Sequence, residues 1–412
     1  MGKTLAKNEI IAGVDIGTTK VATTVAEVNH HGQIEILGAA SVPSAGLKKG
    51  IVVNMDATVA GIRASIERAA SVAGAEIGSV VINVTGEHIS SLNSRAIVSI
   101  KREDREITQD DVGRVLDESK RIVLPPEREI IHAIPRGFSI DGQDGIRDPV
   151  GMNGSRLEVE THIVTGASSF LQNLTKCVQR AGREIEDRVH QPIATGMAVV
   201  LQAEKDMGVV LIDIGGGTTD VAIFIGGEIS YSALVPVGGN HISQDIATLL
   251  PTSPEEAERV KIKYGCAMMS LANDEETFDV TRLGTSESAT LPRKEVLAQI
   301  IEPRCEEIFS MIKQHIYKSG FAEMLPAGVV ITGGGALMPG MLDVAERVLE
   351  MRVRLGKAMD VGGLAEQVSN PGFATSVGLV IYEARTRAAE QEESGPKSLM
   401  KSLVGRIRDK FG

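Results

Sequence analysis

The sequence has few cysteines, no long apolar run and no excess of positive charge, and each absence excludes a class of protein. Its three cysteines, Cys177, Cys266 and Cys305, lack the spacing of a metal site, so a reducing cytosol is expected. No run of about 18 apolar residues occurs, and the start MGKTLAKNEI does not resemble a signal peptide. The net charge of −11 argues against a nucleic-acid partner. At roughly 100–200 residues per domain, the length suggests two to four domains.

What the sequence does contain is a short phrase that occurs twice. DIGTTK at residues 15–20 returns as DIGGGTTD at residues 213–220, each time between two β-rich apolar runs. This pattern predicts a β-hairpin with an enlarged glycine turn. A third strand and a helix are predicted after each copy, at 33–43 and 56–74 in the first, and at 228–239 and 241–250 in the second.

A second similarity joins residues 162–182 to the stretch that begins at Val329. Both are predicted to form a strand, a glycine turn and a helix. The chain therefore contains two α/β halves of like design, each with inserted material. Duplicated halves usually pack as a pseudo-twofold pair, so a cleft between them is expected.

The residue types in the two turns point to an anion. Glycines allow successive backbone N–H groups to converge on one spot. Hydroxyl donors are available in both turns, from Thr18, Thr19, Thr218 and Thr219. A carboxylate beside each turn, Asp15 or Asp213, would repel a phosphate unless a hard cation such as water-held Mg²⁺ came between them. Two facing turns would hold a polyphosphate, while the alternative is two tight turns with no ligand.

Five segments in order resemble the nucleotide site of the actin, Hsp70 and sugar-kinase superfamily. They are the phosphate loops at 15–21 and 213–220, the connecting helices at 191–196 and 370–378, and the adenosine motif at 333–336. The resemblance implies an α/β actin-like (ribonuclease H-like) duplicated fold that binds ATP or ADP with Mg²⁺, the metal held by Asp15 and Asp213. The nucleotide-binding residues that it implies are Asp15, Gly17, Thr18, Thr19, Lys20, Asp213, Gly215, Gly216, Gly217, Thr218, Thr219, Gly238, Gly239, Glu258, Lys261, Gly333, Gly334, Gly335 and Ala336.

Within this superfamily, the whole chain resembles the FtsA family of bacterial cell-division proteins. The resemblance is carried by GIVVNMDA, VTGEHIS, HAIPRGFSIDGQDGIRDPVGM and IEPRCEEI. It implies a first half at 1–83, completed by 163–202 and 370–384, and a second half at 203–240, completed by 325–369. It also implies inserted subdomains at 84–162 and 241–324, a flexible linker at 385–395 and an amphipathic helix at 396–412.

The first insertion, 84–162, opens with the β-rich run SRAIVSI. Thr108 followed by Asp111 then predicts a capped helix. The family resemblance implies that this subdomain serves self-interaction and contacts with other division proteins. The alternative is an insertion that only stabilises the fold.

The second insertion, 241–324, begins a helix at Ser253 and Pro254, a good cap followed by a good first residue. Residues 295–318 are expected to form a helix interrupted at Pro303. By resemblance, Glu258 and Lys261 flank the adenosine and Arg304 contacts the C-terminal tail of the tubulin-like protein FtsZ. The alternatives are an exposed charged face for the first pair and a solvated charge for Arg304.

Hydrolysis of a nucleotide requires a water in line with the terminal phosphate. Gln191 stands where related proteins position that water. Because a neutral amide orients water but accepts protons poorly, a scaffold with at most slow ATP hydrolysis is expected. The alternative is that Gln191 only caps the helix before Pro192.

The last 17 residues form a basic amphipathic pattern. Helical spacing gives one apolar stripe, made of Leu399, Met400, Leu403, Val404, Ile407 and Phe411. The basic residues are Lys397, Lys401, Arg406, Arg408 and Lys410. The pattern is typical of a helix that lies on an anionic membrane. The alternative is a terminal helix that docks on its own core or on a partner.

The sequence as a whole therefore predicts an ATP-binding actin-like scaffold that assembles head to tail and recruits later division proteins. Its expected place is the cytoplasmic face of the inner membrane at the division site, where it tethers FtsZ filaments. The alternatives are another membrane-associated actin-like protein of the MreB or PilM type, or a sugar kinase.

Overall fold

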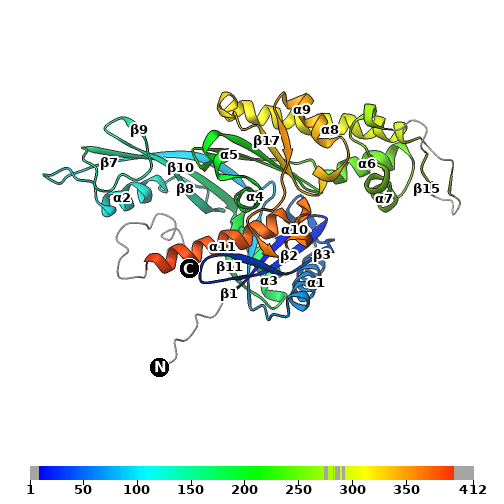
Figure 1. Cartoon of the computed structure of the whole chain (residues 1–412), viewed down its shortest axis with the longest axis horizontal. Helices are drawn as coiled ribbons and strands as arrows, with labels where there is room; N and C mark the ends of the chain where they lie inside the picture. The colour runs from blue at the N-terminus through cyan, green and yellow to red at the C-terminus, as the bar shows by residue number, and fades with distance from the viewer. Residues whose placement is uncertain (1–8, 273–276, 282, 284–287, 290–292, 394–412) are drawn as a thin grey trace.

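The computed structural model describes residues 9–272, 277–281, 283, 288–289 and 293–393. Two α/β halves form the centre of the molecule, and one insertion extends from each end (Figure 1). The predicted amphipathic helix at 396–412 lies outside the described residues. Within the described ranges, no helix has the length and apolar character that a bilayer span requires.

The first half is built on a six-stranded sheet in the order β11-β6-β1-β2-β3-β19. The first copy of the repeated phrase joins two antiparallel strands with Asp15 opposite Ala22, which confirms the predicted hairpin. The strands are β1 (Glu9–Ile16), β2 (Lys20–Val28), β3 (Ile34–Pro43), β6 (Ser79–Val84), β11 (Glu184–His190) and β19 (Gly362–Gly363), with the small hairpin β4 (Leu47–Lys48) and β5 (Ile51–Val52) beside them. Its outer face is covered by α1 (Met55–Ala73) and α3 (Ser168–Arg180).

The second half repeats this design in a five-stranded sheet of order β14-β13-β12-β17-β18. In both sheets the hairpin strands pair antiparallel and the next two strands run parallel, so the predicted duplication is confirmed. The strands are β12 (Val209–Ile214), β13 (Thr219–Ile225), β14 (Glu228–Val235), β17 (Val329–Thr332) and β18 (Val353–Leu355). The smaller elements around it are α5 (Gln202–Met207), η3 (Gly334–Leu337) and α9 (Met341–Leu349), whereas α10 (Ala365–Val368) contacts β3 of the first half.

Two helices lie between the two sheets: α4 (Gln191–Val199) and α11 (Ala374–Glu393), which follows η4 (Pro371–Phe373). Their apolar side chains share one buried cluster with both sheets. The helices approach closely at Gly378, where an added Cβ would lie 1.8 Å from the backbone oxygen of Ala194. This shared core, rather than a covalent hinge alone, sets the two halves against each other.

The flexible linker expected at 385–395 is wrong for most of its length, because α11 continues to Glu393. Thr386 is buried, and Arg387 pairs with Glu383 on its own helix and with Glu9 of β1. A polar sequence continues as a helix here because one side of it packs on the body.

The first insertion is a four-stranded sheet, β7-β10-β8-β9, with one helix on it. Its elements are β7 (Ser90–Ser99), α2 (Gln109–Ser119), β8 (Arg128–Ile140), β9 (Gln143–Ile146) and β10 (Arg156–Ala167). Thr108 and Asp111 form the predicted capping box. Polar side chains join this sheet to β14 of the second half, since Ser91 Oγ donates to the Ser232 carbonyl and Asn93 Nδ2 to the Ser230 carbonyl.

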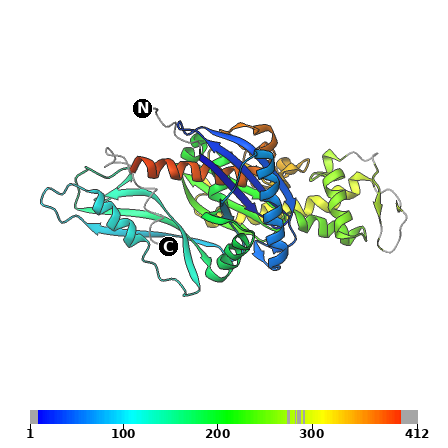
Figure 2. The ribbon, with the colours of Figure 1, turned by 90° about the horizontal axis from the view of Figure 1, so that it is seen from below.

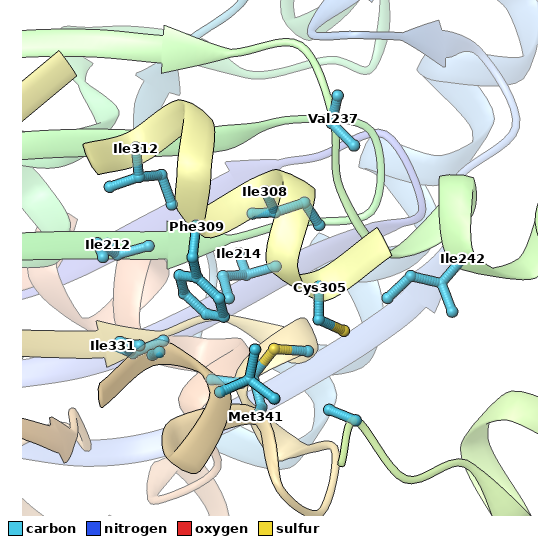
Figure 3. Close-up of a cluster of buried hydrophobic side chains, with 14 of the residues drawn as sticks. Ile212, Ile214, Val237, Ile242, Cys305, Ile308, Phe309, Ile312, Ile331 and Met341 are labelled. Atoms are coloured by element: carbon cyan, nitrogen blue, oxygen red, sulfur yellow. The ribbon is translucent and has the colours of Figure 1, made fainter. Parts of the chain in front are cut away.

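The second insertion is mainly helical. It contains α6 (Gly239–Leu249), α7 (Pro254–Tyr264), η1 (Met269–Leu271), β15 (Val280–Thr281), β16 (Ser288–Ala289), α8 (Lys294–Lys318) and η2 (Ala322–Met324). Ser253 caps α7 as predicted. The expected interruption at Pro303 is wrong, since α8 passes through it. Figure 3 shows why: Cys305, Ile308, Phe309 and Ile312 pack against the sheet of the second half, and this burial outweighs the hydrogen bond that the proline lacks.

Three buried histidines lie where the first insertion meets the two halves: His132 of β8, His162 of β10 and His190 at the end of β11. His162 Nδ1 lies 2.7 Å from Asn93 Oδ1, and the backbone N–H of His190 donates to His132 Nε2 at 3.0 Å. Burial is the main cause that lowers the pKa of His132 and His162 to about 4 and that of His190 to about 3. These rings therefore stay neutral in the folded protein.

We predict a measurable acid destabilisation from His162. Its pKa is lower in the folded than in the unfolded state, so it stabilises the fold above about pH 6.5, and this contribution is lost as the pH falls towards 4. Each such histidine changes the free energy of unfolding by up to about 1.4 kcal/mol per pH unit. The free energy of unfolding, measured with denaturant between pH 7 and 4, should fall less steeply for His162→Gln than for the native chain. The exposed control His31→Gln should keep the native slope; equal slopes for all three would contradict the assignment.

Candidate functional site

The two glycine turns face each other and interlock. Each is closed by its own backbone bond, from Gly17 N–H to the Lys20 carbonyl at 3.0 Å and from Gly215 N–H to the Thr218 carbonyl at 2.9 Å. A Cβ on Gly216 would lie 2.2 Å from Thr19 Cγ2, and one on Gly217 would lie 2.9 Å from Thr18 Oγ1. Only glycine at these places allows the turns of the two halves to come so close.

A small cavity of about 50 Å³ lies between the turns. Both turns line it, together with residues from five other places in the chain, namely Gly50, Thr85, Gln191, the pair Gly333 and Gly334, and the group Pro371, Gly372 and Thr375. Sites for small molecules usually measure about 300–1,000 Å³. The cavity between the turns is thus smaller than a site for a nucleotide-sized ligand usually is.

Three buried carboxylates lie close together here: Asp15 and Asp213 line the cavity, and Asp220 lies outside its lining, near Asp213. Asn83 Nδ2 donates to Asp15 Oδ1 at 2.9 Å, Gln191 Nε2 donates to Asp213 Oδ2 at 3.0 Å, and the Thr85 hydroxyl donates to Asp220 Oδ1 at 2.7 Å. Thr195 and Thr375 also donate to Asp213 Oδ2, at 3.2 and 3.3 Å. Neutral donors thus hold all three carboxylates in place.

Burial and mutual repulsion raise the pKa of these carboxylates. Desolvation, followed by the charge of Asp213, raises the pKa of Asp220 to about 8. Desolvation also raises the pKa of Asp15 to about 7, although Lys20 opposes it, and it raises the pKa of Asp213. The cluster contains more negative charge than its surroundings stabilise, so it favours a cation.

Lys20 supplies positive charge at the edge of the cavity. Its ammonium donates to the Gly372 carbonyl and lies 5.9 Å from the centre of the Phe373 ring. It lowers the pKa of both Asp15 and Asp213 through its charge. The lysine of the first turn is therefore placed where a phosphate between the turns would meet it.

Gln191 is the first residue of α4 and its side chain lines the cavity. Its Oε1 accepts from Asn83 at 2.9 Å while its Nε2 donates to Asp213, so the amide links the two halves. His190, not Gln191, holds the N-cap position. Gln191 therefore does not cap the helix, and that alternative is wrong.

Several residues of the predicted site lie outside the cavity. Thr219 donates its hydroxyl to the Val237 carbonyl at 2.8 Å, and Gly239 lies behind the second turn, with its N–H on the Gly215 carbonyl. Lys261 pairs with Glu258 at 2.6 Å and donates to the Gly239 carbonyl. The others outside the lining are Gly238, which packs on Gly216, Gly335, which packs on Ile214, and the buried Ala336.

Sequence reasoning missed the polar residues that hold the carboxylates. Asn83 lies near the end of the buried strand β6 and Thr85 directly follows it, while Thr195 and Thr375 lie in the two connecting-helix motifs. Asp220 ends the repeated phrase itself. A search for polar residues at the ends of parallel strands and inside those two motifs would have found the first four.

Arg304 is not a free charge. Its guanidinium forms a two-pronged ion pair with Asp245 of α6, at 2.7 and 2.9 Å, and a further contact with Glu307. An open cavity of about 730 Å³ lies beside α8, and its lining includes Pro303, Glu302, Glu306 and Arg347. Arg304 does not line this cavity, so the oriented arginine and the hollow are separate features beside α8.

The chain is similar to cell division proteins over most of its length. A family model described as "Cell division protein FtsA" matches residues 210–378, and one described as "SHS2 domain inserted in FTSA" matches residues 86–165. The cell division protein FtsA of Pseudomonas aeruginosa is 42% identical over 374 residues, which cover 91% of this chain and 89% of that protein.

Solved structures share the fold at low sequence identity. The PilM-PilN type IV pilus biogenesis complex gives a TM-score of 0.65 at 16% identity, covering 91% of this chain and 98% of that chain. MreB5 of Spiroplasma citri bound to ADP gives 0.55 at 14% identity, covering 94% and 99%. These matches confirm the predicted actin-like α/β fold and, at such identity, show the fold alone.

We predict that Gly216→Ala destabilises the protein by about 1–3 kcal/mol, because the new methyl group overlaps Thr19. Thr19→Ala in the same chain should restore part of this loss, since it removes the colliding atoms. Gly334→Ala also lines the cavity, yet its Cβ would meet nothing within 4 Å, so it should leave the unfolding free energy unchanged. Denaturant unfolding of the ligand-free protein measures all three; equal stability of Gly216→Ala and Gly334→Ala would show that the turns do not interlock.

Proposed function

Because the chain belongs to the FtsA family of cell division proteins, we propose that it binds ATP with Mg²⁺ between its halves and tethers FtsZ filaments to the inner membrane. It does this as a head-to-tail polymer on the cytoplasmic face of the membrane at the division site, where it recruits later division proteins. The observation that carries the nucleotide site is the meeting of two glycine turns at three buried carboxylates.

The chemistry of the cavity fits a phosphate chain with magnesium. Backbone N–H groups of the turns and the ammonium of Lys20 suit the phosphates, and carboxylate oxygens suit Mg²⁺. Mg²⁺ usually keeps several waters and binds through one or two carboxylates. Asp15 and Asp213 would hold it in this way, through bound waters. The bound metal would neutralise phosphate charge beside the raised-pKa carboxylates.

The contacts of Gln191 support a scaffold with at most slow hydrolysis. Both ends of its amide are engaged, one with Asn83 and one with Asp213, so a water would have to replace one of these bonds. The amide orients a water but cannot take its proton. Retention of ATP, rather than rapid turnover, is the state that these contacts favour.

We predict that ATP binding requires Mg²⁺ and Asp213. Asp213→Asn should weaken Mg·ATP binding by roughly 10–100-fold, because it removes charge that the metal needs. Thr219→Val is the matched control from the same phosphate loop; its hydroxyl points to Val237, so affinity should be native. Titration calorimetry with and without a chelator measures the effect. Equal affinity without Mg²⁺ would contradict the proposed metal role.

The membrane contact rests on the sequence of residues 396–412, which lie outside the described residues. Their apolar stripe and five basic residues suit an anionic surface, where each lysine or arginine contributes about 1 kcal/mol. One such segment binds weakly and reversibly, whereas a polymer that carries many binds by avidity. Membrane attachment and self-assembly therefore support each other.

For the FtsZ contact we propose the face of the second insertion around Arg304. Asp245 orients this guanidinium, which leaves 26% of the side chain exposed. A carboxylate from an FtsZ tail would bind there by sharing or displacing Asp245. Arg304 is then paired with Asp245 when FtsZ is absent and with the FtsZ carboxylate when it is bound, so its charge is stabilised in both states.

We predict that the full chain with ATP makes FtsZ co-sediment with anionic vesicles. A chain that ends at residue 395 should bind ATP, but neither this chain nor FtsZ should co-sediment with the vesicles. The charge exchange Asp245→Arg with Arg304→Glu keeps the internal ion pair, so it should retain vesicle binding and lose most FtsZ recruitment. Co-sedimentation at physiological salt measures each component. Recruitment by the truncated chain would rule out the proposed anchor, and native recruitment by the exchanged pair would rule out Arg304.

A further inference from the structure

An apolar groove of about 480 Å³ lies between the first insertion, α4 and the end of α11. It is separate from the cavity between the glycine turns. Its apolar lining includes Ile134, Phe138, Ile193, Met197 and Tyr382. Figure 2 shows α11 running along the body towards the sheet of the first insertion, so the last turns of this helix form one wall.

The groove is large enough for several apolar side chains. A cavity of about 150 Å³ holds one benzene-sized group, so this groove has room for about three. Two of its rim arginines, Arg136 and Arg147, are paired with Glu160 and Asp206. The other charged residues of the lining are Arg385 and Glu228, which carry opposite charges, so the apolar lining rather than charge is what suits the groove to the segment.

The position of α11 identifies a segment that reaches the groove. Ala389 lines it, and α11 ends four residues later, at Glu393. Only residues 394–396, Ser-Gly-Pro, separate this end from the basic amphipathic segment. Two antiparallel helices need a connection of about 2–5 residues, so three suffice for the chain to reverse.

The lengths also agree. At 1.5 Å per residue, α11 runs about 16 Å from Tyr382 to its end at Glu393. A helix over residues 397–411 would be about 22 Å long and would pass that whole stretch on its way back. In such an antiparallel pair, Leu403, Val404 and Ile407 would lie opposite residues 383–387, within the part of α11 that lines the groove.

We propose that residues 396–412 dock in this groove in the lipid-free protein and must leave it to bind a membrane. The proposal rests on the membrane role given above for the same segment. Its single apolar stripe cannot be buried in the groove and in lipid at once, so the two states exclude each other. Docking protects the stripe in solution and makes membrane affinity depend on the groove.

The chain contains no tryptophan, so Leu403→Trp provides one clean reporter. In the full chain without lipid, its emission should be shifted to the blue, as for a buried indole. Ala389→Arg places a long charged side chain in the groove and should move this emission to that of a water-exposed indole. The matched control is Ala388→Arg, one residue away on the exposed side of α11 and outside the lining, which should leave it unchanged.

The same variants should differ in vesicle binding. Since docking withholds the segment from lipid, Ala389→Arg should reach half-maximal binding at roughly five- to tenfold less anionic lipid than Ala388→Arg. Met197→Lys, from the opposite wall, should act like Ala389→Arg, and unchanged melting temperatures would show that both variants fold. If variants in both walls give the same effect, the effect comes from the groove and not from damage to one helix.

Docking would be overturned by water-like emission in the lipid-free full chain, or by identical behaviour of Ala389→Arg and Ala388→Arg. A blue shift that appears only as protein concentration rises would also overturn it, because the segment would then occupy a second copy. Failure of the membrane role looks different. In that case the emission responds to Ala389→Arg as expected, yet no variant binds vesicles.

Discussion

The burial of three carboxylates at one point between two sheets is the constraint on which the rest of the structure depends. Asp15, Asp213 and Asp220 lie where like charges repel and water is scarce, and burial raises the pKa of each. The surrounding residues stabilise these carboxylates with neutral hydrogen-bond donors and with one lysine, Lys20, at the edge of the cavity. A cation would complete such a site, and under the proposed function Mg²⁺ supplies it.

The hairpins that carry these carboxylates could be predicted from the sequence, because each is local. Residues 15–20 and 213–220 lie between apolar runs, and the glycines fix the turn whatever surrounds it. The donors could not be predicted in the same way. Asn83 and Thr85 reach the carboxylates only because the end of β6 lies beside β1, and Thr85 crosses to the other half of the molecule. Such contacts depend on how two separate sheets meet, so a sequence pattern can mark these residues as candidates but cannot assign the carboxylate that each one holds.

The two errors in secondary structure have one cause. Pro303 and the polar run after Tyr382 both carry local signals that end helices, yet α8 and α11 continue through them. In each case one face of the helix is held by the body, by the apolar cluster around Cys305 and Phe309 or by the pairs of Arg387. Local preferences of about 1–3 kcal/mol lose to packing of this extent.

The nine residues of α4 connect the two ends of the proposed function. Gln191 and Thr195 contact Asp213 in the cavity, while Ile193 and Met197 line the groove on the other side of the same helix. A nucleotide that parts the glycine turns has to change the contacts of Gln191, because its amide joins the two halves. Any rotation or shift of α4 that follows must alter the groove, since a rigid helix moves both faces together. Under the proposed function, occupation of the nucleotide site and release of the membrane segment would therefore be coupled through this one helix.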